Sequence, residues 1–238
     1  MTRPIEDALD ALLDRHGLPA DATAPLAVYL DLLEQPEAPT AVHDPRQAID
    51  LHIADSLAAL EIAEIHSAGF IADLGAGAGL PGLVLACVLP NAHVVLVEAA
   101  RRKCDFLRSA IVALGVDNAE VVWARAEEWA AGLGRCDVVC ARALATLPVL
   151  FEYAAPLLRE GGQLIAWKGA VPDSEAADAD AAAAHLGLAA DPVRRVVPFP
   201  GATNRTLHVL RKVAPTPAKY PRRPGIARKR PLSAKSLR

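Results

Sequence analysis

The amino-acid sequence predicts an α/β protein with a mostly parallel sheet of seven strands, helices on both faces and a helical segment in front. From residue 70 onward, five short apolar runs alternate with longer amphipathic stretches. The residues before 70 instead show apolar side chains at helical spacings of three and four. Right-handed crossovers between successive strands place the intervening helices over the two faces of a parallel sheet.

Length and composition exclude several classes of protein. A chain of 238 residues, 53% hydrophobic and 22% charged, can bury a full core. Its longest nearly apolar run, residues 80–89, is about half the ~20 residues that cross a bilayer, and the start shows no basic-then-apolar leader. Four cysteines form no CxxC or Cys/His array. We therefore expect a cytoplasmic protein without a membrane segment, disulfide framework or metal site, with a monomer favoured.

The N-terminal segment is expected to be a helical cap. Helices are predicted over residues 4–17 and 25–35, and a third over residues 44–66. This third helix has Asp44 as its N-cap and Pro45 at its first position. We divide the chain into a cap at residues 1–68, a central domain at 69–214 and a basic tail at 215–238.

The central domain is expected to consist of strand and helix units. Parallel strands are predicted at residues 70–74, 93–98, 119–123, 136–142 and 162–169. The helices that follow them are predicted from Leu80 and at residues 99–115, 124–132, 147–160 and 173–185. Residues 193–199 and 205–213 lack an intervening helix, so an antiparallel hairpin is expected there.

A glycine-rich loop, "DLGAGAGLPG", follows the first predicted strand, where an open parallel sheet binds its ligands. It fits two patterns: Gly75-x-Gly77-x-Gly79, common in methyl-donor sites, and Gly77-x-Gly79-x-x-Gly82, the dinucleotide spacing. Asp73 distinguishes them, because its carboxylate would repel a pyrophosphate and attract the cationic S-adenosylmethionine. Alternatively, Asp73 caps the next helix or braces the loop.

Two further acidic positions follow strands two and three. Glu98 ends the second strand, where a carboxylate can accept hydrogen bonds from both hydroxyls of a ribose. After the third strand, Ala126 and Glu127 stand where a backbone amide and a carboxylate could meet an adenine edge. The alternatives are a surface carboxylate for Glu98 and, for Glu127 and Glu128, first-turn acids that stabilise a helix N-terminus.

The end of the fourth strand, "CARALA", lacks the residues that activate a difficult methyl acceptor. There is no Asn/Asp-Pro-Pro-aromatic turn, and Cys140 has no evident partner that would make it a nucleophile. A ring nitrogen with a free lone pair would need only orientation and exclusion of water, so we predict no catalytic side chain. Arg142 could hold the cofactor or lie against the base, and Lys168 could neutralise phosphate or purine oxygen; both could equally be members of structural ion pairs.

The C-terminal 20 residues carry a strong local charge. Residues 219–238 contain eight of the 25 Lys and Arg residues and no Asp or Glu, while the rest of the chain has 17 basic and 28 acidic residues. A cationic arm on an acidic body suits a polyphosphate partner such as RNA. The alternative is a solvated extension. The expected RNA contacts, together with Lys168, are Arg222, Arg223, Arg228, Lys229 and Arg230.

Several stretches together resemble one enzyme family. "IADLGAGAGLPG", "EAARRKCDFL", "RAEE", "ARALA", "GGQLIAWKG" and "YPRRPGIARKRPL" occur in the order and spacing of RsmG (GidB), the bacterial 16S rRNA guanine-N7 methyltransferases. Upstream, "TAVHDPRQAIDLHIADSL" resembles the segment that contains the family's His-x-x-Asp-Ser-Leu element. The resemblance spans roughly residues 40 to 232, and this combination of motifs is far more specific than a single glycine loop.

The resemblance implies a Rossmann-like class I methyltransferase fold that uses S-adenosylmethionine to modify a guanine in the decoding-region loop of 16S rRNA. The implied cofactor contacts are Gly75, Leu80, Ala126, Glu127 and Arg142, with Glu98 binding the ribose by analogy with related methyltransferases. His52, Asp55 and Ser56 match the upstream element, and could alternatively be a helix-packing and capping cluster.

The mechanism expected from these features is direct transfer, in which the purine N7 lone pair attacks a sulfonium methyl held in line with the departing sulfur. Three alternatives remain open at this stage. They are a nicotinamide-dependent oxidoreductase that uses the dinucleotide spacing, a non-catalytic RNA-binding relative, and a methyltransferase that acts on another RNA or on a small molecule.

Overall fold

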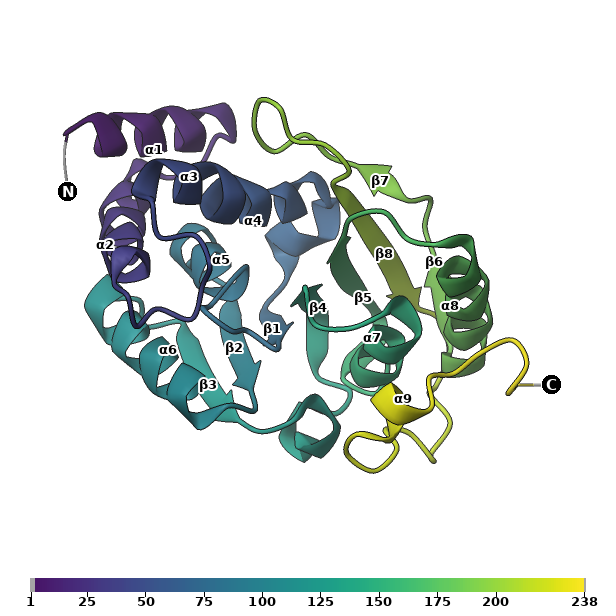
Figure 1. Cartoon of the computed structure of the whole chain (residues 1–238). Helices are drawn as coiled ribbons and strands as arrows, with labels where there is room; N and C mark the ends of the chain where they lie inside the picture. The colour runs from purple at the N-terminus through teal and green to yellow at the C-terminus, as the bar shows by residue number, and fades with distance from the viewer. Residues whose placement is uncertain (1–2, 238) are drawn as a thin grey trace.

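The computed structural model describes residues 3–237, which form a mixed eight-stranded sheet with helices on both faces (Figure 1). The strand order is β3-β2-β1-β4-β5-β8-β6, and β7 also pairs with β8. The strands are β1 (Phe70–Leu74), β2 (His93–Glu98), β3 (Ala119–Trp123), β4 (Cys136–Arg142), β5 (Leu158–Lys168), β6 (Leu188–Ala190), β7 (Arg194–Arg195) and β8 (Thr206–Lys212). Strands β1 to β5 are parallel, as predicted, and the order reverses between β1 and β4.

The predicted hairpin is confirmed, although its first strand is much shorter than expected. β7 covers two residues, which pair antiparallel with Leu207 and Thr206 at the start of β8. Pro198 and Pro200 follow closely and have no N–H to donate to a ladder, so the strand cannot extend through them. The sequence analysis did not anticipate β6, which pairs antiparallel with the end of β8 and raises the strand number from seven to eight.

The N-terminal segment is helical, as expected. It contains α1 (Arg3–Arg15), a 3-10 turn η1 (Ala20–Ala22) and α2 (Thr23–Glu34). The third predicted helix is divided into α3 (Pro45–Ala48), a π-helical stretch η2 (Ile49–Ala54), α4 (Asp55–Leu57) and the 3-10 turns η3 (Ala58–Glu61) and η4 (Ala63–Ser67). Asp44 is its N-cap, and its Oδ1 accepts a hydrogen bond from Gln47 N at 2.9 Å.

The remaining helices pack on the sheet. They are α5 (Gly82–Val88), α6 (Arg101–Leu114), α7 (Leu147–Ala154), α8 (Asp173–Leu186) and the short α9 (Ile226–Lys229). The helix predicted at 124–132 is wrong, because two 3-10 turns, η5 (Ala126–Glu128) and η6 (Ala130–Gly132), take its place. Trp129 between them has φ −83° and ψ 73°, which interrupts the helix and buries its ring, stacked on Phe70 at 6.5 Å between centroids.

Two hydrophobic clusters lie on opposite faces of the sheet. The first joins the N-terminal helices, through side chains such as Leu30 and Ile53, to α5 and to one face of β1 and β2. The second contains α7, α8 and the other sheet face. Three side chains of the C-terminal segment, Tyr220, Ala227 and Leu232, are buried in the second cluster. The basic tail therefore packs against the body, and Figure 1 shows its yellow helix α9 beside α7.

An internal ion pair holds this tail in place. Glu152 of α7 is fully buried, and its Oε1 and Oε2 accept hydrogen bonds from Arg222 Nε at 2.8 Å and Nη2 at 2.5 Å. Arg222 also donates to Arg230 O at 2.9 Å, and its hydrogen bonds to Glu152 raise its own pKa. The Arg222 side chain is thus engaged by the protein itself, unlike the exposed side chain of Arg223. No helix in residues 3–237 combines the length and apolarity needed to cross a bilayer.

We expect Arg222→Met to lower the free energy of unfolding by about 3 kcal/mol, because it leaves the buried Glu152 carboxylate without its partner. The matched control Arg223→Met removes a neighbouring exposed cation and should change stability by less than about 0.5 kcal/mol. Urea denaturation followed by circular dichroism measures both values. Equal effects of the two substitutions would contradict the anchoring role of the pair.

Candidate functional site

Two adjoining cavities lie at the carboxyl ends of the central strands, beside the reversal of strand order. The Glu98 cavity, about 320 Å³, is lined by residues that include Gly75, Glu98, Ala126, Glu127, Ala143 and Arg228. The Arg142 cavity, about 480 Å³, is lined by residues that include His52, Asp55, Arg142, Ala143, Lys168 and Arg205. Both volumes fall in the range of small-molecule sites. Ala143 lines both cavities, so the two spaces meet at the end of β4.

The glycine loop forms the turn between β1 and α5. Gly75, Gly77 and Gly79 all have positive φ angles, of 67°, 59° and 99°. At Gly75 a side chain is also excluded by space, because a Cβ atom would lie 2.6 Å from Leu144 Cδ1. The N-terminal cap holds this loop, since the buried Tyr29 hydroxyl donates a hydrogen bond to Ala78 O at 2.6 Å. The loop backbone is thus fixed next to the Glu98 cavity.

Asp73 braces the loop from inside. It is 1% exposed, and its Oδ2 accepts a hydrogen bond from Gly82 N at 2.9 Å. Its Oδ1 has no hydrogen-bond partner among the described residues, and burial raises the pKa of the carboxyl from 3.8 to about 7. Asp73 lines neither cavity. These contacts match the bracing alternative, and an electrostatic effect of Asp73 on a cationic ligand stays a prediction.

Glu98 has the arrangement expected of a ribose-binding carboxylate. Its Oε2 accepts a hydrogen bond from Gly77 N at 3.1 Å, and its Oε1 accepts one from Ala100 N at 2.8 Å. A carboxylate has about four acceptor positions, so these two amides leave room for two hydroxyl donors. The side chain lines the cavity although the residue is only 7% exposed. The remaining acceptor positions of Glu98 therefore fit the two ribose hydroxyls of S-adenosylmethionine.

The far wall of the Glu98 cavity combines the predicted adenine-edge residues with the C-terminal tail. Ala126 and Glu127 line the cavity, as does Arg228. Glu127 Oε1 accepts a hydrogen bond from Gly225 N at 2.9 Å, and Arg228 Nη2 donates to Leu144 O at 3.0 Å. The sequence analysis placed Arg228 among the RNA contacts. Its position in this cavity could not be deduced from charge alone.

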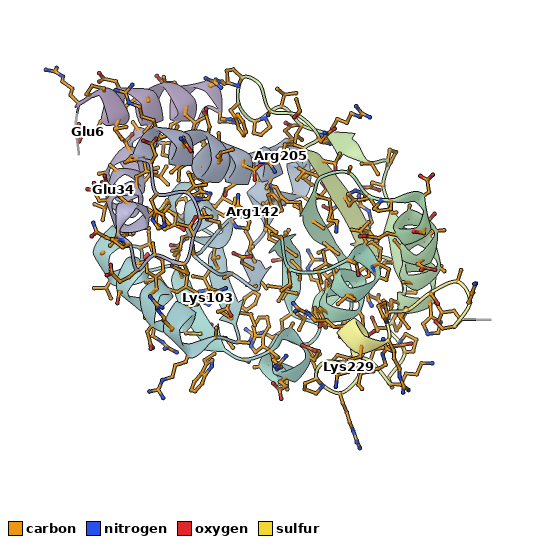
Figure 2. All side chains as sticks on the ribbon, viewed as in Figure 1. Glu6, Glu34, Lys103, Arg142, Arg205 and Lys229 are labelled. Carbon is orange, nitrogen blue, oxygen red and sulfur yellow. The ribbon has the colours of Figure 1, made fainter. Side chains whose placement is uncertain are left out.

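Arg142 lies in the other cavity. Its Nη1 donates to Asp55 Oδ2 at 2.9 Å and to Leu51 O at 3.2 Å. Arg205 Nε, from the start of the β8 region, lies 3.5 Å from Asp55 Oδ1, so the buried carboxylate stands between two guanidinium groups. Figure 2 shows Arg142 and Arg205 between the N-terminal helices and the central strands. Arg205 is not among the site residues predicted from the sequence.

His52 and Ser56 contribute differently to this region. His52 Nε2 lies 2.8 Å from Thr40 Oγ1, and burial together with the nearby Arg142 guanidinium lowers the pKa of its imidazole. The ring is therefore neutral at pH 7. Ser56 is fully buried, and its hydroxyl donates to His52 O at 2.6 Å within the helix. For Ser56 the contacts match the helix-packing alternative, whereas His52 and Asp55 line the Arg142 cavity.

The other predicted residues also have defined places. Lys168 Nζ lies 3.1 Å from Glu175 Oε1 and donates to Ala145 O at 3.2 Å, so it is both an ion-pair member and part of the Arg142 cavity wall. Leu80 is buried and lines neither cavity. Burial raises the pKa of the Cys140 thiol well above its usual range, which leaves it protonated. Within residues 3–237, no group of three or more His, Cys, Asp or Glu side chains is arranged to hold a metal ion.

The fold and the position of the Glu98 cavity define a class I S-adenosylmethionine-dependent methyltransferase. A solved S-adenosylmethionine-dependent O-methyltransferase from Thermotoga maritima is similar in fold, with a TM-score of 0.55 at 14% identity, covering 79% of this chain and 72% of that one. A 16S rRNA (adenine(1408)-N(1))-methyltransferase from Catenulisporales acidiphilia gives a TM-score of 0.52 at 20% identity, covering 66% and 92%.

The chain belongs to the GidB family, rRNA small subunit methyltransferase G, whose sequence model matches residues 25–197. A ribosomal RNA small subunit methyltransferase G from Rubrobacter xylanophilus is 43% identical over 195 residues, which cover 79% of this chain and 75% of the relative. Another from Pelotomaculum thermopropionicum is 41% identical over 197 residues, covering 81% and 82%. The dinucleotide interpretation of the glycine loop is therefore abandoned, and the resemblance seen in the sequence is confirmed.

We expect Asp73→Asn to change how stability depends on pH. The folded state holds a proton on Asp73 up to about pH 7 and the unfolded state only to about 3.8, so the contribution of this group is largest at low pH and is lost as pH rises through that window. The slope for one proton is about 1.4 kcal/mol per pH unit. Asparagine keeps an acceptor for Gly82 N and does not titrate.

Urea denaturation between pH 4.5 and 8 measures this effect. The unfolding free energy of the wild-type protein should fall relative to that of the Asp73→Asn variant as pH rises towards 7, and the difference should be constant above it. The exposed Asp105→Asn variant is the control and should follow the wild-type profile. Parallel profiles for wild type and Asp73→Asn would show that Asp73 is ionised in the folded protein throughout.

Proposed function

We propose that this protein transfers a methyl group from S-adenosylmethionine to N7 of a guanine in the decoding-region loop of 16S rRNA. The observation that supports this most directly is the meeting of two cavities at Ala143. One contains a carboxylate, Glu98, with free acceptor positions for a ribose, and its wall also includes the cations Lys103, Arg125 and Arg228. The other is lined by Arg142, Lys168 and Arg205, which could contact an RNA base or phosphate. Family membership supports the same assignment.

The donor would occupy the Glu98 cavity, where it would supply a methyl group on a positively charged sulfur. Glu98 would accept hydrogen bonds from the ribose hydroxyls, and Ala126 with Glu127 would face the adenine. Gly75 and Gly77 would allow the donor to approach the loop backbone closely, because neither has a side chain. Gly79 and Leu80 would act indirectly, by shaping the turn.

The acceptor guanine would occupy the Arg142 cavity. Its N7 and O6 atoms are acceptors, and lysine or arginine is the usual partner for that edge. An N7 lone pair needs no removal of a proton, which agrees with the neutral His52 and the protonated Cys140 thiol. In this proposal the residues of the cavity orient the base and exclude water, and none forms a covalent bond to it.

The tail would contact RNA phosphates through the cations that the protein leaves free. Arg223, Lys229 and Arg230 have exposed side chains. Arg222 is occupied by Glu152, and Arg228, although also exposed, lines the Glu98 cavity and donates to Leu144 O, so we do not count either among these contacts. The proposed partner is 16S rRNA, alone or in the small subunit, which in bacteria lies in the cytoplasm.

Methyl transfer to defined substrates tests the proposal. The protein is incubated with donor labelled in the methyl group and, separately, with unmodified small ribosomal subunits, naked 16S rRNA and unrelated RNA, and the labelled base is then mapped by mass spectrometry. We expect 7-methylguanine in the decoding-region loop of one or both 16S substrates. Label in a different RNA or at a different atom would move the activity to another acceptor, and RNA binding without label would indicate a non-catalytic relative.

Glu98→Gln should weaken binding of S-adenosylmethionine by about 10-fold or more, because hydrogen bonds to a charged acceptor are replaced by weaker ones and one acceptor oxygen is lost. Isothermal titration calorimetry measures the affinity. Glu160→Gln changes an exposed glutamate of β5 in the same way and should leave it unchanged. An unaltered affinity in a folded Glu98→Gln protein would remove the Glu98 cavity from the donor assignment.

The exposed tail cations should control the salt dependence of RNA binding. Substituting Arg223, Lys229 and Arg230 together by Gln should reduce the slope of log affinity against log salt by about 2, at about 0.7 for each contact with single-stranded phosphate. Substitutions are preferable to deletion of the tail, because its buried side chains belong to the second hydrophobic cluster. Arg3, Arg15 and Arg108 are exposed on α1 and α6, and changing them to Gln is the matched control. The same loss of slope in both triple variants would assign the effect to net charge.

A further inference from the structure

The C-terminal segment approaches the Glu98 cavity from outside the methyltransferase sheet. Gly225 N donates to Glu127 Oε1, and Arg228 Nη2 donates to Leu144 O. Leu144 and Glu127 are themselves lining residues of this cavity. The segment therefore touches two separate parts of the wall, one after β3 and one after β4.

The contacts of Arg228 also extend to α7. Tyr153 of α7 lines the same cavity and interacts with both Glu127 and Arg228. These three side chains form a polar group in which a carboxylate, a phenol and a guanidinium face one space. Such a group can hold the polar edge of an adenosine and limit the access of water to it.

Lys229, the next residue along the chain after Arg228, does not line the Glu98 cavity. Figure 2 shows the side chain of Lys229 extending away from the body of the protein into solvent. Arg230 and Arg223 are likewise exposed, and so is Arg228, which differs from them in lining the cavity and donating to Leu144 O. The short helix α9 and its flanks thus divide their cations between the cavity and the outer surface.

Contacts with the body of the protein fix the position of α9. The buried Ala227 packs in the second hydrophobic cluster, and the Arg222–Glu152 ion pair fixes the chain a few residues earlier. Because the protein itself fixes this segment, Arg228 is held at the cavity wall while the neighbouring cations face solvent.

From these contacts we propose that the C-terminal segment belongs to both binding sites: Arg228 completes the wall of the donor cavity, while Arg223, Lys229 and Arg230 face RNA. This inference rests on the proposed function, because it takes the Glu98 cavity as the donor site. It assigns neighbouring arginine and lysine residues of α9 to different ligands.

Donor affinity without RNA tests the role of Arg228. Calorimetry with the unreactive product S-adenosylhomocysteine should show binding about 10-fold weaker for Arg228→Gln and changed by less than twofold for Lys229→Gln, while RNA affinity falls for Lys229→Gln. Thermal unfolding checks that both variants are folded. If Arg228→Gln is not, Arg228→Lys keeps the charge without the planar fork and should still bind the product several-fold more weakly.

The outcomes separate the inference from the proposed function. Donor binding that is unaffected by either change at Arg228 but weakened by Glu98→Gln would overturn the inference and leave the donor site in place. Binding that is unaffected by both Glu98→Gln and Arg228→Gln would remove the donor site itself. Equal losses in Arg228→Gln and Lys229→Gln would also overturn the inference, because they would indicate a general effect of charge.

Discussion

The carboxylate of Glu98 connects two of the loops that surround the Glu98 cavity. By accepting hydrogen bonds from Gly77 N and Ala100 N, it ties the glycine loop after β1 to the start of α6 after β2. The two strands are neighbours in parallel register, so their carboxyl ends must lie side by side. A carboxylate at this point satisfies two partly buried amides and still offers lone pairs to a ligand, and a neutral side chain of the same size could do only part of this.

Much of the fold could be predicted from the sequence because it depends on local pattern. The five parallel strands follow from alternating apolar and amphipathic stretches, and the start of α3 at Pro45 follows from the preceding Asp44. The turns at residues 126–132 could not be predicted in this way. Helical periodicity there gives way to burial of the Trp129 ring against Phe70, a contact between residues 59 positions apart in the chain. Similarly, β6 depends on pairing with the distant β8.

The same holds for the site: residues that depend on local sequence could be predicted, whereas contacts between residues distant in the chain could not. Glu98 and Ala126 could be placed because strand ends in a parallel sheet share one edge. Arg142, Arg222 and Arg228 were assigned by family pattern or charge, and the structure gives them partners that those criteria do not reveal: Asp55, Glu152 and Leu144. Each partner lies more than 65 positions away in the chain. Basic residues with such partners cannot be distinguished from free ones by composition.

The two ends of the chain support the surroundings of the Glu98 cavity from opposite faces of the sheet. Tyr29 in the N-terminal helices holds the glycine loop through Ala78 O, and Gly225 in the tail binds Glu127. The first belongs to one hydrophobic cluster and the tail to the other. Both terminal segments therefore contribute contacts that shape the surroundings of this cavity.

Ala143, where the two cavities meet, is a non-glycine residue with a φ angle of 54°. That conformation costs an alanine about 1 kcal/mol, and a β-branched side chain would be strained further. Ala143 lines both cavities, so a larger side chain here would take space from one or both of them. Tolerance to sequence change should therefore be narrow at this position, with glycine as the replacement that relaxes the backbone and takes no space from either cavity.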